Sequence, residues 1–324
     1  MALAKKIFAK IFAFFVVSKI IKSYPNAAQI QINTLKSLIN KAKKTKFGIE
    51  HQFHKINSVE EYIDKVPIRD YEEIKKYIDE IKKGSKGVLW PGKPKYLAKT
   101  SGTTSGAKYI PITNESMPNH ILSSRNALLF YIYETGDTSF LNGKTIFLQG
   151  SPVLDEINGI LIGRLSGIVA HHIPSYLRKN NLPSVKTNSI EDWEKKVNEI
   201  CKETINENMT TIGGIPSWVQ MYFEVLLKKS NKKNISELFK GLSLFVYGGV
   251  NFLPYEKIFN KLLGKKINTI EYYPASEGFF AYQNSQKDKS LLLQYNSGIF
   301  YEFIKTNEFE SEKYTRYNLT NVEV

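Results

Sequence analysis

The chain has 324 residues, of which 45 are Lys or Arg and 31 are Asp or Glu, so its formal net charge is +14. Its 42% hydrophobic and 13% aromatic content can build a sizeable core, which excludes a disordered protein, and its length suits one large α/β domain or two ordinary ones. The single cysteine, Cys201, excludes an intramolecular disulfide and an all-cysteine metal site. Because this cysteine usage fits a reducing compartment, we expect a cytoplasmic protein.

The positive charge comes mostly from lysines scattered over the whole chain rather than gathered in one stripe. Such a surface attracts anions in general. Neither zinc-finger spacing nor an aromatic RNA-binding signature accompanies the lysines. We therefore expect a solvated basic surface and no nucleic-acid partner.

Residues 1–27 form a basic and apolar segment that begins MALAKKIFAKIFAFFVV. Lys10 and Lys19 bracket only eight residues, whereas a transmembrane helix needs about 20 apolar residues. The sequence SKIIKS after the apolar run is a poor cleavage site for a signal peptide. We predict an amphipathic helix whose Ile/Phe/Val face packs on the domain formed by residues 28–324, with weak membrane-surface association as the alternative.

Residues from about 28 to 83 have helical patterning with clear start signals. Ser58 to Glu61 forms a capping box, and Asp70 to Glu73 forms another. Pro67 separates the two predicted helices, and Gly84 stands where a C-cap is expected.

The segment KTSGTTSGAKYIPIT, Lys99 to Thr113, gathers small and hydroxylated residues between two strand-like runs. Glycines let backbone N–H groups converge on one point, hydroxyls add donors, and Lys108 adds a charge, so the loop suits phosphate oxygens. It is not a Walker A motif, because no Gly-Lys-Ser/Thr closes it and a strand follows. Composition leaves two interpretations open: a phosphate-binding nest, or a hairpin loop rich in small residues.

The next elements follow from apolar periodicity and start signals. We predict a helix from about 115 to 133, a buried strand within 143–151, an amphipathic helix from Ser189 to about Ile205, and a strand at TTIGG that leads into a helix at Pro216.

Residues 242–278 read as a strand, a helix and a second strand, which predicts a βαβ unit with parallel strands. The two strands end at YGGV and YPASEG, which parallel pairing places at one edge of the sheet, where open α/β sheets bind ligands. Glu277 at this edge is a candidate Mg²⁺ ligand, and Tyr272 or Tyr273 a candidate stacking partner for a purine. The structural alternatives are a helix-capping or solvent-facing carboxylate for Glu277 and core packing for the two tyrosines.

TSGTTSGAK, residues 100–108, resembles the first signature of the Gretchen Hagen (auxin-responsive promoter) family of acyl acid–amido synthetases, within the adenylate-forming superfamily. Ser105 stands between Thr104 and Gly106, which is this family's spacing, whereas acyl-CoA and luciferase-type relatives place glycine directly after the threonine pair. YPASE resembles the second signature, Tyr-x-Ser-Ser-Glu, with Ala275 in place of the first serine. GIPSWVQMYFE and VYGGV resemble further blocks, so the likeness covers nearly the whole chain after the N-terminal segment, especially to bacterial members.

The resemblance implies an α/β fold, the adenylate-forming N-terminal domain with parallel-rich β-sheets flanked by helices. It implies ATP and Mg²⁺ as cofactors, and a small carboxylic acid and an amino acid as substrates. The acid is activated as an acyl-adenylate, and the amine then displaces AMP to form an amide. By matching position, the resemblance implies phosphate contacts at Thr100, Ser101, Thr103 and Thr104. It implies an adenine pocket at Gly248, Gly249 and Val250 with Tyr273 facing the base, and a contact of Glu277 with Mg²⁺ and the α-phosphate. Gly102, Gly106 and Ser276 are further expected cofactor-binding residues.

The sequence offers two further candidates, an arginine and a pair of histidines, that no recognised motif supports. Arg125, on the helix after the loop, is a candidate for holding the substrate carboxylate, against the commoner alternative of an exposed surface arginine. His171-His172 lacks the spacing of a metal site, so we interpret the pair as packing residues.

The family continues beyond the equivalent of Val324 into a third signature with a ribose-binding aspartate and a mobile C-terminal lid that bears a lysine. We therefore expect a truncated chain without the lid, and a monomer. An acyl-CoA ligase of the same superfamily is the first alternative. A catalytically impaired protein that binds nucleotide, acyl acid or a membrane surface is the second.

Overall fold

The structure is a computed structural model, and it describes residues 2–100, 106–174, 178–309, 311 and 314–323. The chain divides into two compact units, each built from separate stretches of sequence. Unit 1 comprises residues 1–18, 120–154 and 163–293, and unit 2 comprises residues 19–119, 155–162 and 294–324. The boundary at residue 27 that the sequence suggests stays a prediction.

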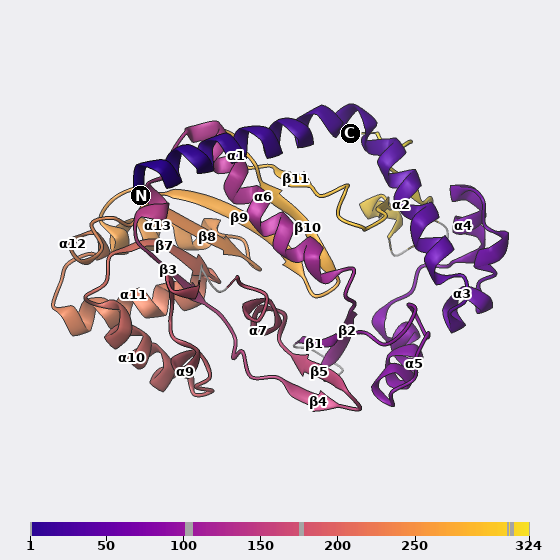
Figure 1. The fold of residues 1–324 in the computed structure, drawn as a ribbon, viewed down its shortest axis with the longest axis horizontal. Helices are drawn as coiled ribbons and strands as arrows, with labels where there is room; N and C mark the ends of the chain where they lie inside the picture. Colours follow the sequence, from indigo (N-terminus) through magenta and orange to yellow (C-terminus); the bar gives the residue numbers. More distant parts are fainter. Residues whose placement is uncertain (1, 101–105, 175–177, 310, 312–313, 324) are drawn as a thin grey trace. The chain divides into compact units, whose positions relative to one another are not determined.

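Unit 1 is built on a seven-stranded sheet in the order β11-β10-β9-β8-β7-β3-β6 (Figure 1). Neighbouring strands pair in parallel along the row β6, β3, β7, β8 and β9. Strand β10 then pairs antiparallel with β9, and β11 pairs antiparallel with β10. The strands are β3 (Lys144–Leu148), β6 (Asn181–Leu182), β7 (Met209–Gly214), β8 (Leu244–Gly248), β9 (Asn268–Ala275), β10 (Gly278–Gln283) and β11 (Leu291–Leu293).

The helices of unit 1 cover both faces of this sheet. They are α1 (Ala2–Ser23, up to residue 18), α6 (Met117–Thr135), α7 (Leu165–Ala170), α9 (Val185–Asn188), α10 (Trp193–Thr204), α11 (Pro216–Ser230), α12 (Ile235–Leu238) and α13 (Leu253–Leu263), with the 3₁₀ turn η3 (Ser139–Asn142). Phe223 of α11, Phe245 of β8 and Phe259 of α13 lie together in the core on one face. On the other face α6 packs on the sheet, where the rings of Phe130 and Tyr282 lie 5.7 Å apart.

Unit 2 combines short helices with a four-stranded sheet in the order β2-β1-β5-β4. Its elements are η1 (Tyr24–Asn26), α2 (Ala27–Ala42), α3 (Lys46–Glu50), η2 (Phe53–Lys55), α4 (Val59–Lys65), α5 (Tyr71–Lys82), β1 (Tyr96–Thr100), β2 (Lys108–Ile112), β4 (Asp155–Ile157), β5 (Ile160–Gly163), β12 (Glu302–Phe303), η4 (Thr306–Glu308) and β13 (Tyr317–Asn318). One apolar cluster lies among α2, η2 and α4, and a second among α5, β1 and β5.

The helix start signals of unit 2 are confirmed. Asp70 accepts a hydrogen bond from Glu73 N, and the Glu73 carboxylate accepts one from Asp70 N, which is a complete capping box. Ser58 likewise accepts from Glu61 N, but the Glu61 carboxylate accepts its bond from Asn57 N, one residue before the predicted partner.

Two expectations about helices were wrong. The helix expected to start at Ser189 starts at Trp193, because Asp192 accepts a hydrogen bond from Lys195 N and Val185–Asn188 forms a helix of its own. The expected packing of the Ile/Phe/Val face of α1 also fails. Ala13 and Val17 are the buried residues of this helix, and most of its large apolar side chains are exposed. The buried side of α1 is thus a narrow one around Ala13 and Val17, which leaves the bulky side chains outside it.

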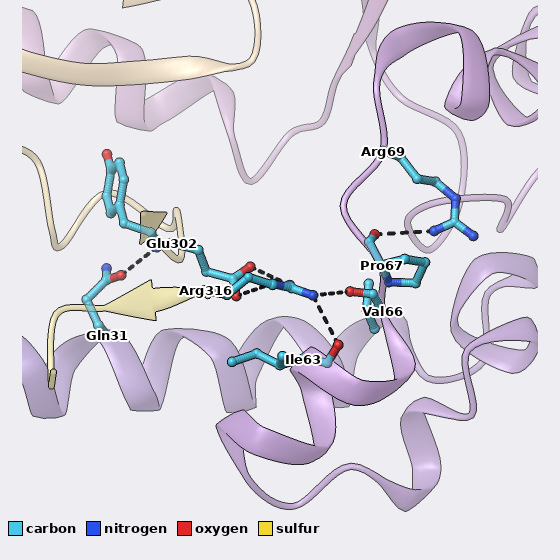
Figure 2. A network of polar contacts seen from close by, with 8 residues as sticks. Gln31, Ile63, Val66, Pro67, Arg69, Glu302 and Arg316 are labelled. Carbon is cyan, nitrogen blue, oxygen red and sulfur yellow. Dashed lines mark hydrogen bonds and ion pairs between the residues drawn. The ribbon is translucent and has the colours of Figure 1, made fainter. Parts of the chain in front are cut away.

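A buried polar network ties residues 302–316 to the helices of unit 2 (Figure 2). Arg316 donates two parallel hydrogen bonds to the Glu302 carboxylate, with N···O distances of 2.9 and 2.7 Å. Its remaining guanidinium nitrogen donates to the backbone carbonyls of Ile63 and Val66, at the end of α4, at 3.1 and 2.6 Å. Only 6% of the Arg316 side chain is exposed, so this charge depends on all four contacts.

Gln31 makes a second set of buried hydrogen bonds in the same unit. Its amide nitrogen donates to the carbonyls of Tyr295 and Ile299 at 2.6 and 2.8 Å, and its oxygen accepts from Tyr301 N at 2.8 Å. The side chain is buried, and these bonds use most of its hydrogen-bonding capacity. Gln31 therefore holds residues 295–301 against α2.

We expect Arg316→Ala to lower the free energy of unfolding by about 3 kcal/mol, because it leaves the Glu302 carboxylate and two carbonyls without their donor. Chemical denaturation followed by circular dichroism measures the change. The control is Lys202→Ala, which removes the exposed pair with Glu199 and is expected to cost below about 0.5 kcal/mol. Equal effects of the two substitutions would contradict a structural role for the Arg316 network.

Candidate functional site

The predicted βαβ unit is present as β8, α13 and β9. The apolar, β-prone run LFVY forms β8, a proline in the first turn starts α13, and Gly264 in the left-handed conformation (φ +72°) ends it. β8 pairs with β9 in parallel, with Leu244 opposite Asn268 and Gly248 opposite Tyr272. Gly248 to Val250 and Tyr273 to Glu277 therefore lie at the carboxyl ends of two neighbouring parallel strands, at one edge of the sheet, as predicted.

Gly248 lies where the two strands approach most closely. A Cβ at this position would stand 2.4 Å from the carbonyl oxygen of Tyr272, so a larger residue would push β8 and β9 apart. Gly249 follows in the left-handed region (φ +85°), which turns the chain away from the sheet. Val250 emerges 40% exposed, and the Asn251 carboxamide then accepts a hydrogen bond from Leu253 N at the start of α13.

The structure distinguishes the two candidate stacking tyrosines. Tyr272 turns inward, where its hydroxyl donates to the Ser124 carbonyl of α6 at 2.9 Å, and burial raises its pKa. Tyr273 points to the opposite face and is 56% exposed, with its ring edge-on to Phe280 at 5.6 Å. The ring available to a ligand is thus that of Tyr273.

Ser276 and Glu277 form the turn between β9 and β10, where Ala275 pairs with Gly278. The Glu277 side chain is exposed at this turn. In the described part of the chain, no three His, Cys, Asp or Glu side chains gather as a metal cluster. A single accessible carboxylate fits the way Mg²⁺ binds with nucleotide phosphates, which supply most of the remaining ligands.

A groove with a volume of about 870 Å³ runs along α13 and β9 and includes residues of this edge. Its lining includes Gly249, Val250 and Tyr273 at the edge and an aromatic wall of Phe245, Tyr247 and Phe252. Tyr247 donates a hydrogen bond to Glu271 at 3.0 Å, and burial together with this carboxylate raises the tyrosine pKa. Its size and aromatic lining are typical of small-molecule sites.

The small-residue loop belongs to unit 2, where it joins β1 and β2. These strands pair antiparallel, with Thr100 opposite Lys108, so strand precedes and follows the loop as predicted. Ser101, Gly102, Thr103, Thr104 and Ser105 lie outside the described residues. Gly106 is exposed with φ +84°. The Lys108 ammonium lies 5.2 Å above the ring of Tyr71, whose hydroxyl accepts a hydrogen bond from Tyr109 N.

Arg125 and the histidine pair lie on separate elements of unit 1. Arg125 is exposed on α6, where its guanidinium donates to the Asn126 carboxamide at 2.9 Å and lies 5.6 Å from the ring of Phe12. Its substrate-binding role stays a prediction, and this placement agrees with the surface alternative. His171 is exposed, with its Nε2 2.7 Å from the Pro152 carbonyl oxygen, and His172 is partly buried, so the packing role of the pair stays an interpretation.

Lys196 is a buried cation that the sequence did not single out. Its ammonium donates to the carbonyls of Gln149 and Asn188 at 3.0 and 2.7 Å. Gln149 directly follows β3, so Lys196 fixes the chain at the same sheet edge that carries Gly248. Burial, with the nearby charge of Arg164, lowers its pKa to about 8.

The pH dependence of stability tests this placement. The ordinary pKa of lysine is 10.5 and that of folded Lys196 is about 8, so between these values the unfolded chain binds more protons. We expect the free energy of unfolding of the wild type, relative to Lys196→Met, to rise with pH through this window. Urea denaturation of both proteins at a series of pH values measures the difference, and parallel curves would contradict a buried amine.

Gly248→Ala tests the close approach at the site. The added Cβ must displace the Tyr272 carbonyl, so we expect a loss of about 1–3 kcal/mol in stability and faster amide hydrogen exchange in β8 and β9. The control is Gly92→Ala, where φ is +76° but no atom lies within 4 Å of the added Cβ. Unchanged exchange in β8 and β9 of Gly248→Ala would show that the strands tolerate a side chain there.

Comparison with known structures supports the fold. Two acyl acid amido synthetase structures are similar to this chain. AtGH3.15 in complex with 2,4-DB has 16% sequence identity over 84% of this chain and a TM-score of 0.66. GH3.15 has 13% sequence identity over 86% of this chain and a TM-score of 0.69. An open conformation of 2-hydroxyisobutyryl-CoA ligase matches at 11% identity over 81% of this chain, with a TM-score of 0.50 and 57% of that chain covered. The chain spans 57% and 60% of the two amido synthetase chains. No curated protein matches by sequence.

The model of the GH3 family N-terminal domain matches residues 16–184, which is more than half of the chain. This match and the structural similarities agree with the two signatures, and the mixed α/β architecture is that of the N-terminal domain of adenylate-forming enzymes. The chain belongs to the GH3 family.

Proposed function

We propose that the protein uses ATP and Mg²⁺ to activate a carboxylic acid as an acyl-adenylate, which then reacts with an amino acid to form an amide. The substrate carboxylate attacks the α-phosphorus, and pyrophosphate leaves. The amine of the amino acid then attacks the acyl carbon, and AMP leaves as the amide forms. Family membership and the relation to acyl acid amido synthetases support this class of ligase.

The observation that carries the proposal is the shared edge of β8 and β9. Gly248, Gly249 and Val250 offer a backbone turn with little side-chain bulk, beside the accessible ring of Tyr273. In our proposal the adenine ring enters the groove here and lies against Tyr273, since base–aromatic stacking needs an exposed ring face. Ser276 and Glu277 on the next turn are then close to the phosphates.

The proposed chemistry depends on charge rather than on a covalent intermediate with the protein. The transfer at phosphorus needs alignment and neutralisation of developing negative charge. Mg²⁺ supplies part of that charge, and Glu277 is the carboxylate proposed to hold it. On the hairpin of unit 2, Thr100, Ser101, Gly102, Thr103, Thr104 and Gly106 are the proposed phosphate contacts, and Lys108 the proposed cation.

An acyl-CoA ligase is the second candidate, since 2-hydroxyisobutyryl-CoA ligase has a similar fold. Both reactions share the adenylation step and differ in the nucleophile that takes the acyl group. Ser105, which gives the loop the amido-synthetase spacing, favours the amine. Product analysis with an amino acid mixture and with coenzyme A distinguishes the two.

ATP–pyrophosphate exchange across a panel of carboxylic acids tests the adenylation step. The chain spans 57% and 60% of the amido synthetase chains, so this chain is assayed together with any longer product of the same gene. We expect acid-dependent exchange that Glu277→Gln lowers by about 100-fold, because the proposed Mg²⁺ ligand loses its charge.

The matched control is Glu224→Gln on α11, where an exposed carboxylate accepts a hydrogen bond from Gln220. We expect this variant to exchange at the wild-type rate. Absence of exchange with every acid in both forms of the protein would contradict adenylation, and equal rates for the two variants would remove Glu277 from the mechanism.

A further inference from the structure

Helix α1 has a narrow buried side and meets α6 through aromatic side chains. Ala13 and Val17 are the buried residues of the helix, while the ring of Phe14 lies 6.2 Å from that of Tyr133 and the Arg125 guanidinium lies over the ring of Phe12. Figure 1 shows α6 crossing α1 at an angle. The buried side of α1 is therefore small, and most of the large apolar residues lie outside it.

The outward face of α1 is broadly apolar. Six side chains are at least half exposed: Leu3, Ile7, Phe8, Ile11, Phe14 and Phe15. At 3.6 residues per turn they occupy an arc of about 140° on the side opposite Ala13. The ring of Phe8 stacks on that of Phe12 at 6.0 Å, so the patch is continuous. Exposed apolar patches of this kind mark interaction surfaces.

The charges of α1 favour an anionic partner. The helix carries Lys5, Lys6, Lys10, Lys19 and Lys22 and no Asp or Glu. By the same helical geometry Lys10 and Lys19 border the apolar arc on opposite sides. Lys5 donates to the Leu141 carbonyl at 3.2 Å, and Lys10 interacts with Asp137. None of the five forms an ion pair within 4 Å among the residues that the structure describes.

We propose that α1 binds the surface of an anionic lipid bilayer. The phenyl and aliphatic side chains of the outward face enter the headgroup–acyl boundary, and the bordering lysines reach lipid phosphates. The helix lies in the plane of the membrane, since no helix among the described residues is long and apolar enough to cross one. This proposal is independent of the ligase activity.

Charge favours a bilayer over a second copy of the chain as the occupant of this face. A symmetric dimer through α1 would bring together two identical helices, each with five lysines and no carboxylate. The like charges at both borders would oppose that contact. A bilayer with anionic headgroups pairs with the same lysines while covering the apolar arc.

Co-sedimentation with vesicles tests the proposal. We expect the protein to bind vesicles of phosphatidylcholine with about 30 mol% phosphatidylglycerol at about 0.1 M NaCl, and to bind pure phosphatidylcholine several-fold more weakly. Phe8→Ser with Phe15→Ser is expected to weaken binding about tenfold or more, since two exposed rings lose their insertion. Lys10→Gln with Lys19→Gln is expected to reduce the preference for anionic vesicles several-fold, because two of the five lysines of α1 are removed.

The matched control is Val153→Ser with Val185→Ser, which removes two exposed apolar side chains of unit 1 away from α1 and is expected to bind as the wild type does. Wild-type binding by the phenylalanine variant, or no preference for anionic vesicles, would overturn the proposal. So would a dimer in light scattering that the phenylalanine variant abolishes, without any vesicle binding, because that result assigns the face to a second copy.

Discussion

The parallel pairing of β8 with β9, at the separation that Gly248 permits, is the constraint on which the candidate site depends. The crossover through α13 brings two stretches about 25 residues apart in sequence to the same sheet edge. Because a Cβ at Gly248 would meet the Tyr272 carbonyl, the two strand ends stay close enough for their loops to contact one ligand. The register then sends Tyr272 inward to α6 and Tyr273 outward to the groove.

Polar side chains, rather than apolar area alone, secure the segments around these sheets. Gln31 and Arg316 each satisfy several backbone or carboxylate acceptors in unit 2, and Lys196 does the same for the chain after β3 in unit 1. Irregular segments carry carbonyl groups that no strand or helix satisfies, and a buried donor meets that requirement directly. Each of these side chains therefore fixes a connection whose backbone would otherwise lack partners.

Most elements could be predicted because their signals are local. The Asp70 capping box, the strands β1 and β2 on either side of the loop, and the β8–α13–β9 unit follow from side-chain periodicity, glycines and caps within short windows. The start of α10 was missed because Ser189 and Asp192 both suit a cap, and the preceding short helix α9 decides between them. Lys196 was missed because a lysine on an amphipathic helix is normally exposed, and its burial depends on carbonyls distant in sequence.

The sequence by itself determined the family signatures, the α/β class and the pairing of a glycine turn with an acidic turn at one sheet edge, because these depend on residue type and short spacing. Only the tertiary structure decided which tyrosine is accessible, where Arg316 and Gln31 find their acceptors, and which side of α1 is buried. These outcomes depend on the surfaces that distant segments present. For α1, burial of the side that carries Ala13 and Val17 leaves Phe8 and Phe15 exposed.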